Sequence, residues 1–354
     1  MDKIASQYPR FSKFIGILGI ITGFGGMLFI FIFLIKETIG FLAVPGSQPP
    51  LAPVLPGISI PGAPALSFWH WILAIFFVAI VHEFAHGIQA RVHNIKIKSS
   101  GIAFFGPILA AFVEPDEKQL EKKSRIKQLS VFAGGPFSNL VFGIIFLLIF
   151  VLVLGPISSS VFHPAGINVG SFIEGYPAES SGLEVPFTIE TINGNSSLDF
   201  AGFTDLITKI KVGEAVSLGT DQGAKTIIAG VNPDNDSKGF IGITAFSQKK
   251  EIKSESMILK ALARCLLWFN LLVFWLFVIN IGVGLFNLLP LGIVDGGRMF
   301  LTVATAIFQK KTALRIFSII TWLCLTLIVI NLLPWMIKLV LWICKGISFL
   351  ISIL

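Results

Sequence analysis

A five-residue motif within a long apolar stretch, His82-Glu83-Phe84-Ala85-His86, holds the side chains most suited to chemistry. Residues four apart lie on one face of a helix, so both imidazoles can point at one position. Glu83 lies one step around the helix and can reach a water molecule bound there. Two nitrogen ligands with a carboxylate that accepts the water's proton are typical of zinc proteases. The motif therefore predicts one Zn²⁺ per chain, held by His82 and His86; the alternative is two histidines of the core.

Such a zinc ion needs a third protein ligand, and few carboxylates are available. Outside 156–255 the chain has 8 acidic residues, and among them Asp295 alone lies in a late, largely apolar region. Pro290 and the glycines that follow Asp295 predict a broken helix, which lets the chain return toward the metal. We expect Asp295 to be the third ligand. The alternative is a loop carboxylate that pairs with Arg298.

Two asparagines complete the candidate site. Asn287 precedes the proline break, and Asn139 ends the run Gly134-Gly135-Pro136-Phe137-Ser138-Asn139. An amide beside the metal would hold the substrate strand or donate to the developing oxyanion. The alternative is a hydrogen bond between helices.

The composition places these residues in a membrane protein. Of 354 residues, 54% are hydrophobic and only 13% are charged, against about 25% charged in soluble domains. The net charge of +7 does not indicate a nucleic-acid partner, because it is unevenly placed. Residues 156–255 hold 7 Lys and no Arg against 12 acidic residues, and the remainder holds 20 basic against 8 acidic. Basic excess beside apolar segments marks cytoplasmic loops.

A spanning helix needs about 20 mostly apolar residues. Six segments qualify, of which the last is interrupted by Lys338 and Lys345: 14–35, 66–89, 129–154, 262–289, 313–333 and 335–354. Basic residues precede the first segment and separate the second from the third, whereas 40–67 has no charge. This distribution predicts a cytoplasmic N-terminus, an active site toward the cytoplasmic side and an extracytoplasmic segment 156–255.

Two apolar segments are too short to cross. Turn signals at Gly106 and Pro107 predict that 101–113 is a hairpin dipping into the membrane, and 299–308 suits a short interfacial or re-entrant helix. Segment 156–255 has strand-like runs at 188–192, 226–228 and 240–243, separated by Asn-Gly and Asn-Pro turn signals. We expect one small α/β domain there, between membrane parts at 1–155 and 256–354.

The motifs resemble those of the site-2 protease family of intramembrane zinc metalloproteases. The resemblance rests on three patterns, His82-Glu83-x-x-His86, Asn287-x-x-Pro290-x-x-x-x-Asp295-Gly296, and Gly-Gly-Pro-x-x-Asn139. It implies that His82, His86 and Asp295 bind zinc and that Glu83 activates water. It also implies substrates that are membrane-anchored proteins, cut within or beside their transmembrane helix.

Two more segments share this resemblance. Segment 101–115 resembles the membrane-re-entrant β-hairpin of the family, particularly of its archaeal members, and substrate strand pairing is expected at Gly101, Ile102, Ala103 and Phe104. The outer segment resembles a PDZ domain through 177–183 and 189–194, although 185–188 replaces the usual Gly-Asp. We expect it to filter substrates by size rather than to capture peptide C-termini.

The sequence thus predicts a polytopic α-helical membrane protein with about six transmembrane helices, a re-entrant β-hairpin and an extracytoplasmic PDZ-like α/β domain. The predicted function is intramembrane zinc proteolysis, with the lipid bilayer and single-pass substrates as partners. The alternative is a non-proteolytic transporter or a helix-binding scaffold with a metal site, since broken helices and intramembrane carboxylates also mark ion pathways.

Overall fold

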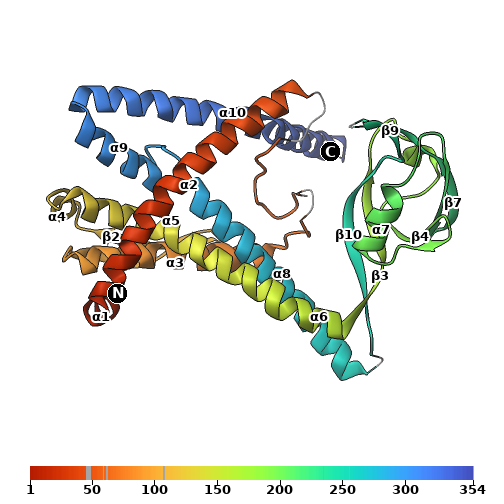
Figure 1. Cartoon of the computed structure of the whole chain (residues 1–354), viewed down its shortest axis with the longest axis horizontal. Coiled ribbons are helices and arrows are strands. Elements are labelled where there is room, and N and C mark those ends of the chain that lie inside the picture. Colours follow the sequence, from red (N-terminus) through yellow and green to blue (C-terminus); the bar gives the residue numbers. More distant parts are fainter. Residues whose placement is uncertain are drawn as a thin grey trace. The chain divides into compact units, whose positions relative to one another are not determined.

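A computed structural model of the chain describes residues 1–44, 49–58, 60, 63–106, 108–233, 235–254 and 256–353 (Figure 1). Of residues 105, 108, 245 and 342–353 it describes the backbone alone. Internal contacts divide the chain into two compact units. The membrane unit comprises Met1–Ile58, Leu66–Phe150 and Leu271–Leu354, and the sheet unit comprises Ser59–Ala65 and Val151–Asn270.

Within the described residues, five helices are long and apolar enough to cross a membrane. They are α2 (Pro9–Ala43), α3 (Phe68–Val92), α5 (Arg125–Leu148) with its continuation through a π-helical turn (Ile149–Leu154) into α6 (Gly155–Val161), α8 (Met257–Phe286) and α10 (Lys310–Ile353). The predicted number of six is therefore wrong. Segments 313–333 and 335–354 belong to one helix, α10, because Pro334 lies inside it without ending it. Membrane helices tolerate such prolines.

Three shorter helices complete the set, α1 (Asp2–Gln7), α4 (Glu117–Glu121) and α9 (Asp295–Ile307). The helix expected at 299–308 is α9, which begins four residues earlier. Its 13 residues span about 20 Å, too little for a hydrocarbon core of about 30 Å.

The turn between α8 and α9 brings Asp295 back into the helix bundle. Leu288, Leu289 and Leu291 are each at most 2% exposed and anchor this turn among α2, α5 and α10. The Thr321 hydroxyl of α10 donates to the Pro290 carbonyl at 3.1 Å. Because α8 ends at Phe286, before the proline, the predicted break in this helix is confirmed.

A β-hairpin follows α3, as predicted. Strand β1 (Ile97–Phe105) pairs antiparallel with β2 (Ile108–Pro115), with Ile102 opposite Ala111. Gly106 adopts a φ of +60° at the turn, and Pro107 lies outside the described residues. Strand β2 lies against α3, which in turn packs on α5, and α5 contacts α2 and α9.

The sheet unit is built on an antiparallel sheet in the order β10-β3-β4-β6-β7, with β5 paired to β4. A second pair joins β8 and β9, and helix α7 (Phe200–Ile207) and a 3-10 turn, Pro177–Ser180, lie between strands of this unit. The strands are β3 (Phe162–Phe172), β4 (Phe187–Ile192), β5 (Asn195–Ser196), β6 (Ala215–Thr220), β7 (Gly223–Ile228), β8 (Gly230–Asn232), β9 (Asn235–Phe240) and β10 (Ile243–Ile252).

The expected strands at 188–192 and 226–228 are confirmed as parts of β4 and β7. The expected strand at 240–243 is wrong, since β9 ends at Phe240 and β10 begins at Ile243. The reason is Gly242, whose φ of +83° turns the chain between the two strands. A Cβ at this position would overlap the Tyr176 side chain.

Candidate metal centre

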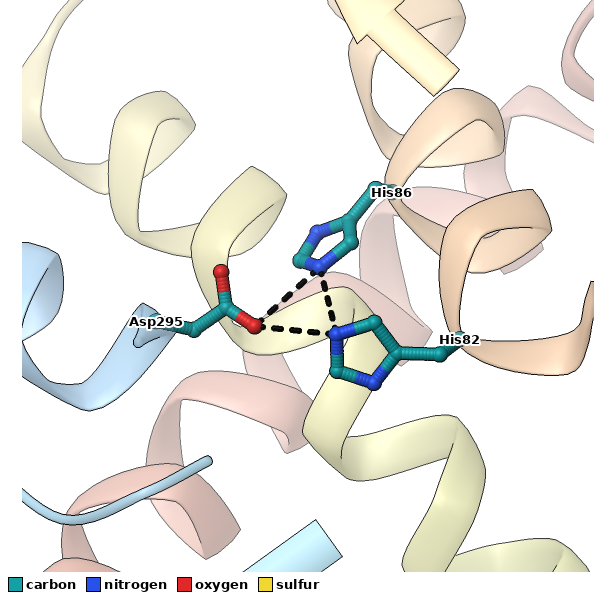
Figure 2. A group of neighbouring side chains, drawn as sticks. All are labelled: His82, His86 and Asp295. Atoms are coloured by element: carbon teal, nitrogen blue, oxygen red, sulfur yellow. Dashed lines mark hydrogen bonds and ion pairs between the residues drawn. The ribbon is translucent and has the colours of Figure 1, made fainter. Parts of the chain in front are cut away.

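Three side chains from two helices converge on one point in the membrane unit (Figure 2). His82 and His86 project from α3, and Asp295 projects from the first turn of α9. His82 Nε2 lies 3.1 Å from His86 Nε2 and 3.1 Å from Asp295 Oδ2, and His86 Nε2 lies 3.2 Å from the same oxygen. The i, i+4 spacing on α3 thus brings both imidazoles to one point.

The triangle formed by these three atoms suits a zinc ion. Nitrogen and oxygen ligands bind zinc at about 2.0–2.2 Å, so neighbouring ligands of a tetrahedral site lie about 3.3–3.6 Å apart. The observed separations of 3.1–3.2 Å are close to that edge length. Three protein ligands also leave the fourth position of a tetrahedral site for water, as in catalytic rather than structural zinc sites.

A glycine on α5 makes room for this centre. A Cβ at Gly135 would overlap His86 Nε2 and lie 2.6 Å from His82 Nε2. Any side chain at Gly135 would therefore fill the space where the two imidazoles meet. The neighbouring Gly134 brings α5 close to the α3 backbone, since its Cβ would lie 3.2 Å from the Ala85 carbonyl oxygen.

The far ring nitrogen of each histidine also has a partner. His86 Nδ1 lies 2.7 Å from the Val131 carbonyl oxygen of α5. A carbonyl only accepts, so Nδ1 carries the proton and Nε2 keeps its lone pair for a metal. His82 Nδ1 lies 3.0 Å from the side-chain amide of Asn139, which is also on α5. This contact is a hydrogen bond between two helices, which is the alternative that the sequence offered for Asn139.

Glu83 contacts the hairpin instead of the three-residue cluster. Its Oε2 accepts a hydrogen bond of 2.9 Å from the Val113 backbone N–H of β2. Since that N–H points at α3, it points away from β1, and so do those of Ala111 and Leu109, two and four residues earlier on the strand. The edge of β2 therefore faces the helix that carries the cluster.

Other predicted residues make different contacts. The Asn287 side-chain amide donates to the Val283 backbone carbonyl one turn earlier at 3.0 Å, and the Asn287 backbone carbonyl accepts from the Gly296 N–H at 2.7 Å. Arg298, the alternative partner of Asp295, pairs with Glu117 at 3.7 Å. Residues 101–104 lie on β1, where Ile102 and Phe104 are 52% and 74% exposed.

Three contributors to this site were given no role from the sequence: Gly135, the Val131 carbonyl and the Val113 N–H. Gly135 lies in the Gly-Gly-Pro-x-x-Asn139 pattern, and adjacent glycines in an apolar span are a signal of close backbone approach. The Val131 carbonyl and the Val113 N–H are backbone groups, which any residue type at those positions would supply. Their roles follow from the packing of α5 and β2 on α3 alone.

Comparisons with known proteins agree with this geometry. The model of peptidase family M50 matches residues 70–329, which include both histidines and Asp295. A Lactococcus lactis protein named "putative zinc metalloprotease" is 25% identical over 59% of this chain and 56% of its own length. A protein of the same description from Clostridium perfringens is 24% identical over 68% of this chain and 84% of its own length.

An uncharacterized protein of Methanocaldococcus jannaschii is 29% identical over 68% of this chain and 58% of its own length. The chain therefore spans somewhat more than half the length of two of these three relatives. The family match covers most of the chain. It includes the hairpin, α5, α8 and α9 in full, and α3 from its third residue onward. The chain belongs to peptidase family M50.

Proposed function

We propose that this protein is an intramembrane zinc metalloprotease that hydrolyses peptide bonds within or beside transmembrane segments of membrane-anchored proteins. The observation that carries the proposal is the convergence of His82, His86 and Asp295 on helices of the membrane unit. Polar side chains of this kind are rare in membrane helices and usually functional there. Family membership agrees with zinc as the metal.

In this mechanism His82, His86 and Asp295 would hold one zinc ion. When bound, zinc lowers the pKa of a water molecule toward neutrality and polarises the scissile carbonyl. Glu83 would take a proton from the attacking water as the water oxygen bonds to the scissile carbonyl carbon, and would pass that proton to the leaving amine as the C–N bond breaks. Asn287 is a candidate for holding the substrate strand, because it lies next to the turn that carries Asp295.

A transmembrane helix must unwind before it can be cut, since its carbonyl groups are bonded within the helix. Strand pairing with the hairpin would hold the freed segment extended. Residues 101–104 belong to β1, and at its outer edge the Ile102 backbone N–H points away from β2. The Glu83 contact instead favours the edge of β2, because a strand paired there lies beside the Glu83 carboxylate. A strand at the outer edge of β1 would lie three strand spacings, about 14 Å, from a strand at the outer edge of β2, with both hairpin strands in between.

Substrate pairing at β2 has a consequence for Glu83. The Val113 N–H that now donates to Glu83 would donate to a substrate carbonyl instead. Glu83 would then be released to act as the base. Binding of an extended segment and activation of the base would therefore be one event.

Proline substitution distinguishes the two edges. Ile102 and Ala111 face each other, and both direct their N–H away from the other strand, so a proline at either leaves the ladder between the strands intact. We expect Ala111→Pro to raise KM for a membrane-anchored substrate by about 2- to 10-fold, the loss of one hydrogen bond, and Ile102→Pro to have little effect. The reverse result would assign substrate pairing to β1. Zinc content serves as the control for folding of both variants.

We also propose the arrangement of the sheet unit. Its antiparallel sheet with α7 and its net negative composition agree with a PDZ-like domain outside the cytoplasm that excludes large substrates. The basic residues of the loops support a cytoplasmic N-terminus and a cytoplasmic hairpin side, and the hairpin would re-enter the membrane from there.

The central experiment measures zinc and hydrolysis on the full chain, purified in detergent. We expect one zinc per chain, loss of the zinc in His86→Ala, and retention of it in Glu83→Gln. Glu83→Gln should cut a single-pass substrate at least about 100-fold more slowly, the effect of losing a general base. Glu121→Gln, an exposed carboxylate at the end of α4, is the matched control. Absence of zinc together with absence of cleavage would favour the non-proteolytic alternative. Cleavage by Glu83→Gln at the native rate would contradict the role of Glu83 as the base.

A further inference from the structure

The two histidines of the centre need the same kind of hydrogen-bond partner. Each can offer Nε2 to a metal only if the ring proton is on Nδ1, and a proton on Nδ1 needs an acceptor. For His86 the acceptor is the Val131 carbonyl, 2.7 Å away. This carbonyl holds His86 in the metal-binding tautomer whether or not a metal is present.

His82 has a different partner. The Asn139 amide lies 3.0 Å from His82 Nδ1, with its nitrogen toward the ring. In that orientation the amide donates to Nδ1, so the His82 proton is on Nε2 and is available to Asp295 Oδ2 at 3.1 Å. A proton on Nε2 leaves that atom no lone pair for a metal.

Nothing else holds the Asn139 amide in one orientation. Its side chain is 0% exposed, and its Oδ1 is buried with no hydrogen-bond partner within the described part of the chain. A half-turn about the Cβ–Cγ bond exchanges oxygen and nitrogen without displacing other atoms. After that half-turn Oδ1 faces His82 and can accept a proton-bearing Nδ1. The amide therefore adapts to either tautomer of His82.

The position of Asn139 also separates it from the reacting atoms. It contacts the Nδ1 side of the imidazole, whereas the metal-facing atoms are Nε2 of both histidines and Oδ2 of Asp295. A fully buried amide behind the ring does not reach a substrate carbonyl in front of it. Asn139 acts through His82.

We infer that Asn139 is a positioning residue, whose amide oxygen accepts the His82 Nδ1–H when zinc binds and thereby fixes the metal-binding tautomer. This inference rests on the proposed zinc site. It replaces a role for Asn139 in oxyanion stabilisation with one in metal affinity. Partners of this kind change metal affinity by about 10- to 100-fold in other zinc sites.

The test compares zinc affinities of the purified full chain by competition with a chelator. Asn139→Leu keeps the volume but removes the acceptor, and we expect its affinity to fall about 10- to 100-fold. Asn139→Asp can only accept, and it should bind zinc at least as tightly as the wild type. Asn280→Leu is the matched control, since Asn280 is also 0% exposed on a helix long enough to span, and its Oδ1 has no hydrogen-bond partner among the residues that the structure describes. It should stay within about threefold of the wild type.

Hydrolysis gives a second measurement. Saturating zinc should restore the activity of Asn139→Leu, which would not happen if Asn139 stabilised the oxyanion or held the substrate. Wild-type affinity in Asn139→Leu, or an affinity of Asn139→Asp no better than that of Asn139→Leu, would overturn the inference while the proposed function stands. If Asn139→Leu does not fold, Asn139→Asp decides alone, because weaker zinc binding than the wild type contradicts the inference. A wild-type chain without zinc overturns both proposals.

Discussion

The contact between α3 and α5 in the membrane unit and the core of the sheet unit are built from different residues. The sheet core consists of large apolar side chains, among them Phe187, Ile189 and Leu218, each at most 1% exposed. The helix contact consists of Gly134 and Gly135, with polar groups between the helices. The Ser130 hydroxyl donates to Gln89 Oε1 at 2.8 Å, and the Gln89 amide donates to the Ser12 carbonyl at 2.9 Å.

The difference follows from what surrounds each unit. Water drives apolar side chains of the sheet unit into its core. Lipid tails are as apolar as leucine, so helices in a membrane gain little by burying one against another. They are held by close backbone approach and by hydrogen bonds, and both place polar groups in the interior. Imidazoles and a carboxylate fit such an interior, whereas the core cluster of the sheet unit, within the described residues, consists of apolar side chains.

The largest effect is expected where close approach and the metal centre coincide. Gly135→Ala places a methyl group against Nε2 of both histidines, with 2.6 Å to His82. We expect zinc affinity to fall by about 100-fold or more and hydrolysis to fall with it. Zinc content and substrate cleavage by the purified chain check both. Gly19→Ala is the matched control, because its Cβ has 3.5 Å to its nearest neighbours in α5. Equal zinc affinity in the two variants would show that Gly135 does not limit the centre.

The second effect concerns the core of the sheet unit: a substitution there should lower the stability of this unit and leave the zinc content unchanged. Phe187→Ala removes a core ring that stacks on Phe172 with centroids 5.9 Å apart. We expect a loss of about 3–5 kcal/mol in the stability of the sheet unit, measured by denaturant unfolding and by proteolysis of that unit. Zinc content should be unchanged. Ile228→Ala, at a side chain that is 66% exposed, should change neither. Loss of zinc in Phe187→Ala would show that the two interiors are not independent.

The same contrast explains which features were predictable from the sequence. The spacing of His82 and His86 fixes one helix face, and Pro290 marks the break that returns Asp295, so the three side chains that converge could be identified without a structure. Pro334 is also a proline in an apolar stretch, but α10 continues through it. A proline alone does not show whether neighbouring helices satisfy the freed backbone groups. The Val131 and Val113 contacts are made by backbone atoms, and residue types carry no information about them.

The smallest effect concerns a polar group at the end of the α3–α5 contact. His93, just beyond the span, lies 3.2 Å from the Ser130 hydroxyl through Nε2, and its buried Nδ1 has no partner within the described residues. Burial, together with Lys127, Lys13 and Lys123 nearby, lowers the pKa of His93 from 6.5 to about 4. Between these values the unfolded chain takes up a proton that the folded chain does not, so the free energy of unfolding falls as the pH falls from 6.5 to 4. Because His93 is only half-buried, we expect its contribution to the pH dependence to be a few degrees of melting temperature at most.

His93→Gln should reduce the drop in melting temperature between pH 7 and pH 5, since every other titrating group is shared with the wild type. An equal drop in melting temperature for His93→Gln and the wild type would mean that the polar contacts between α3 and α5 tolerate a charge on His93.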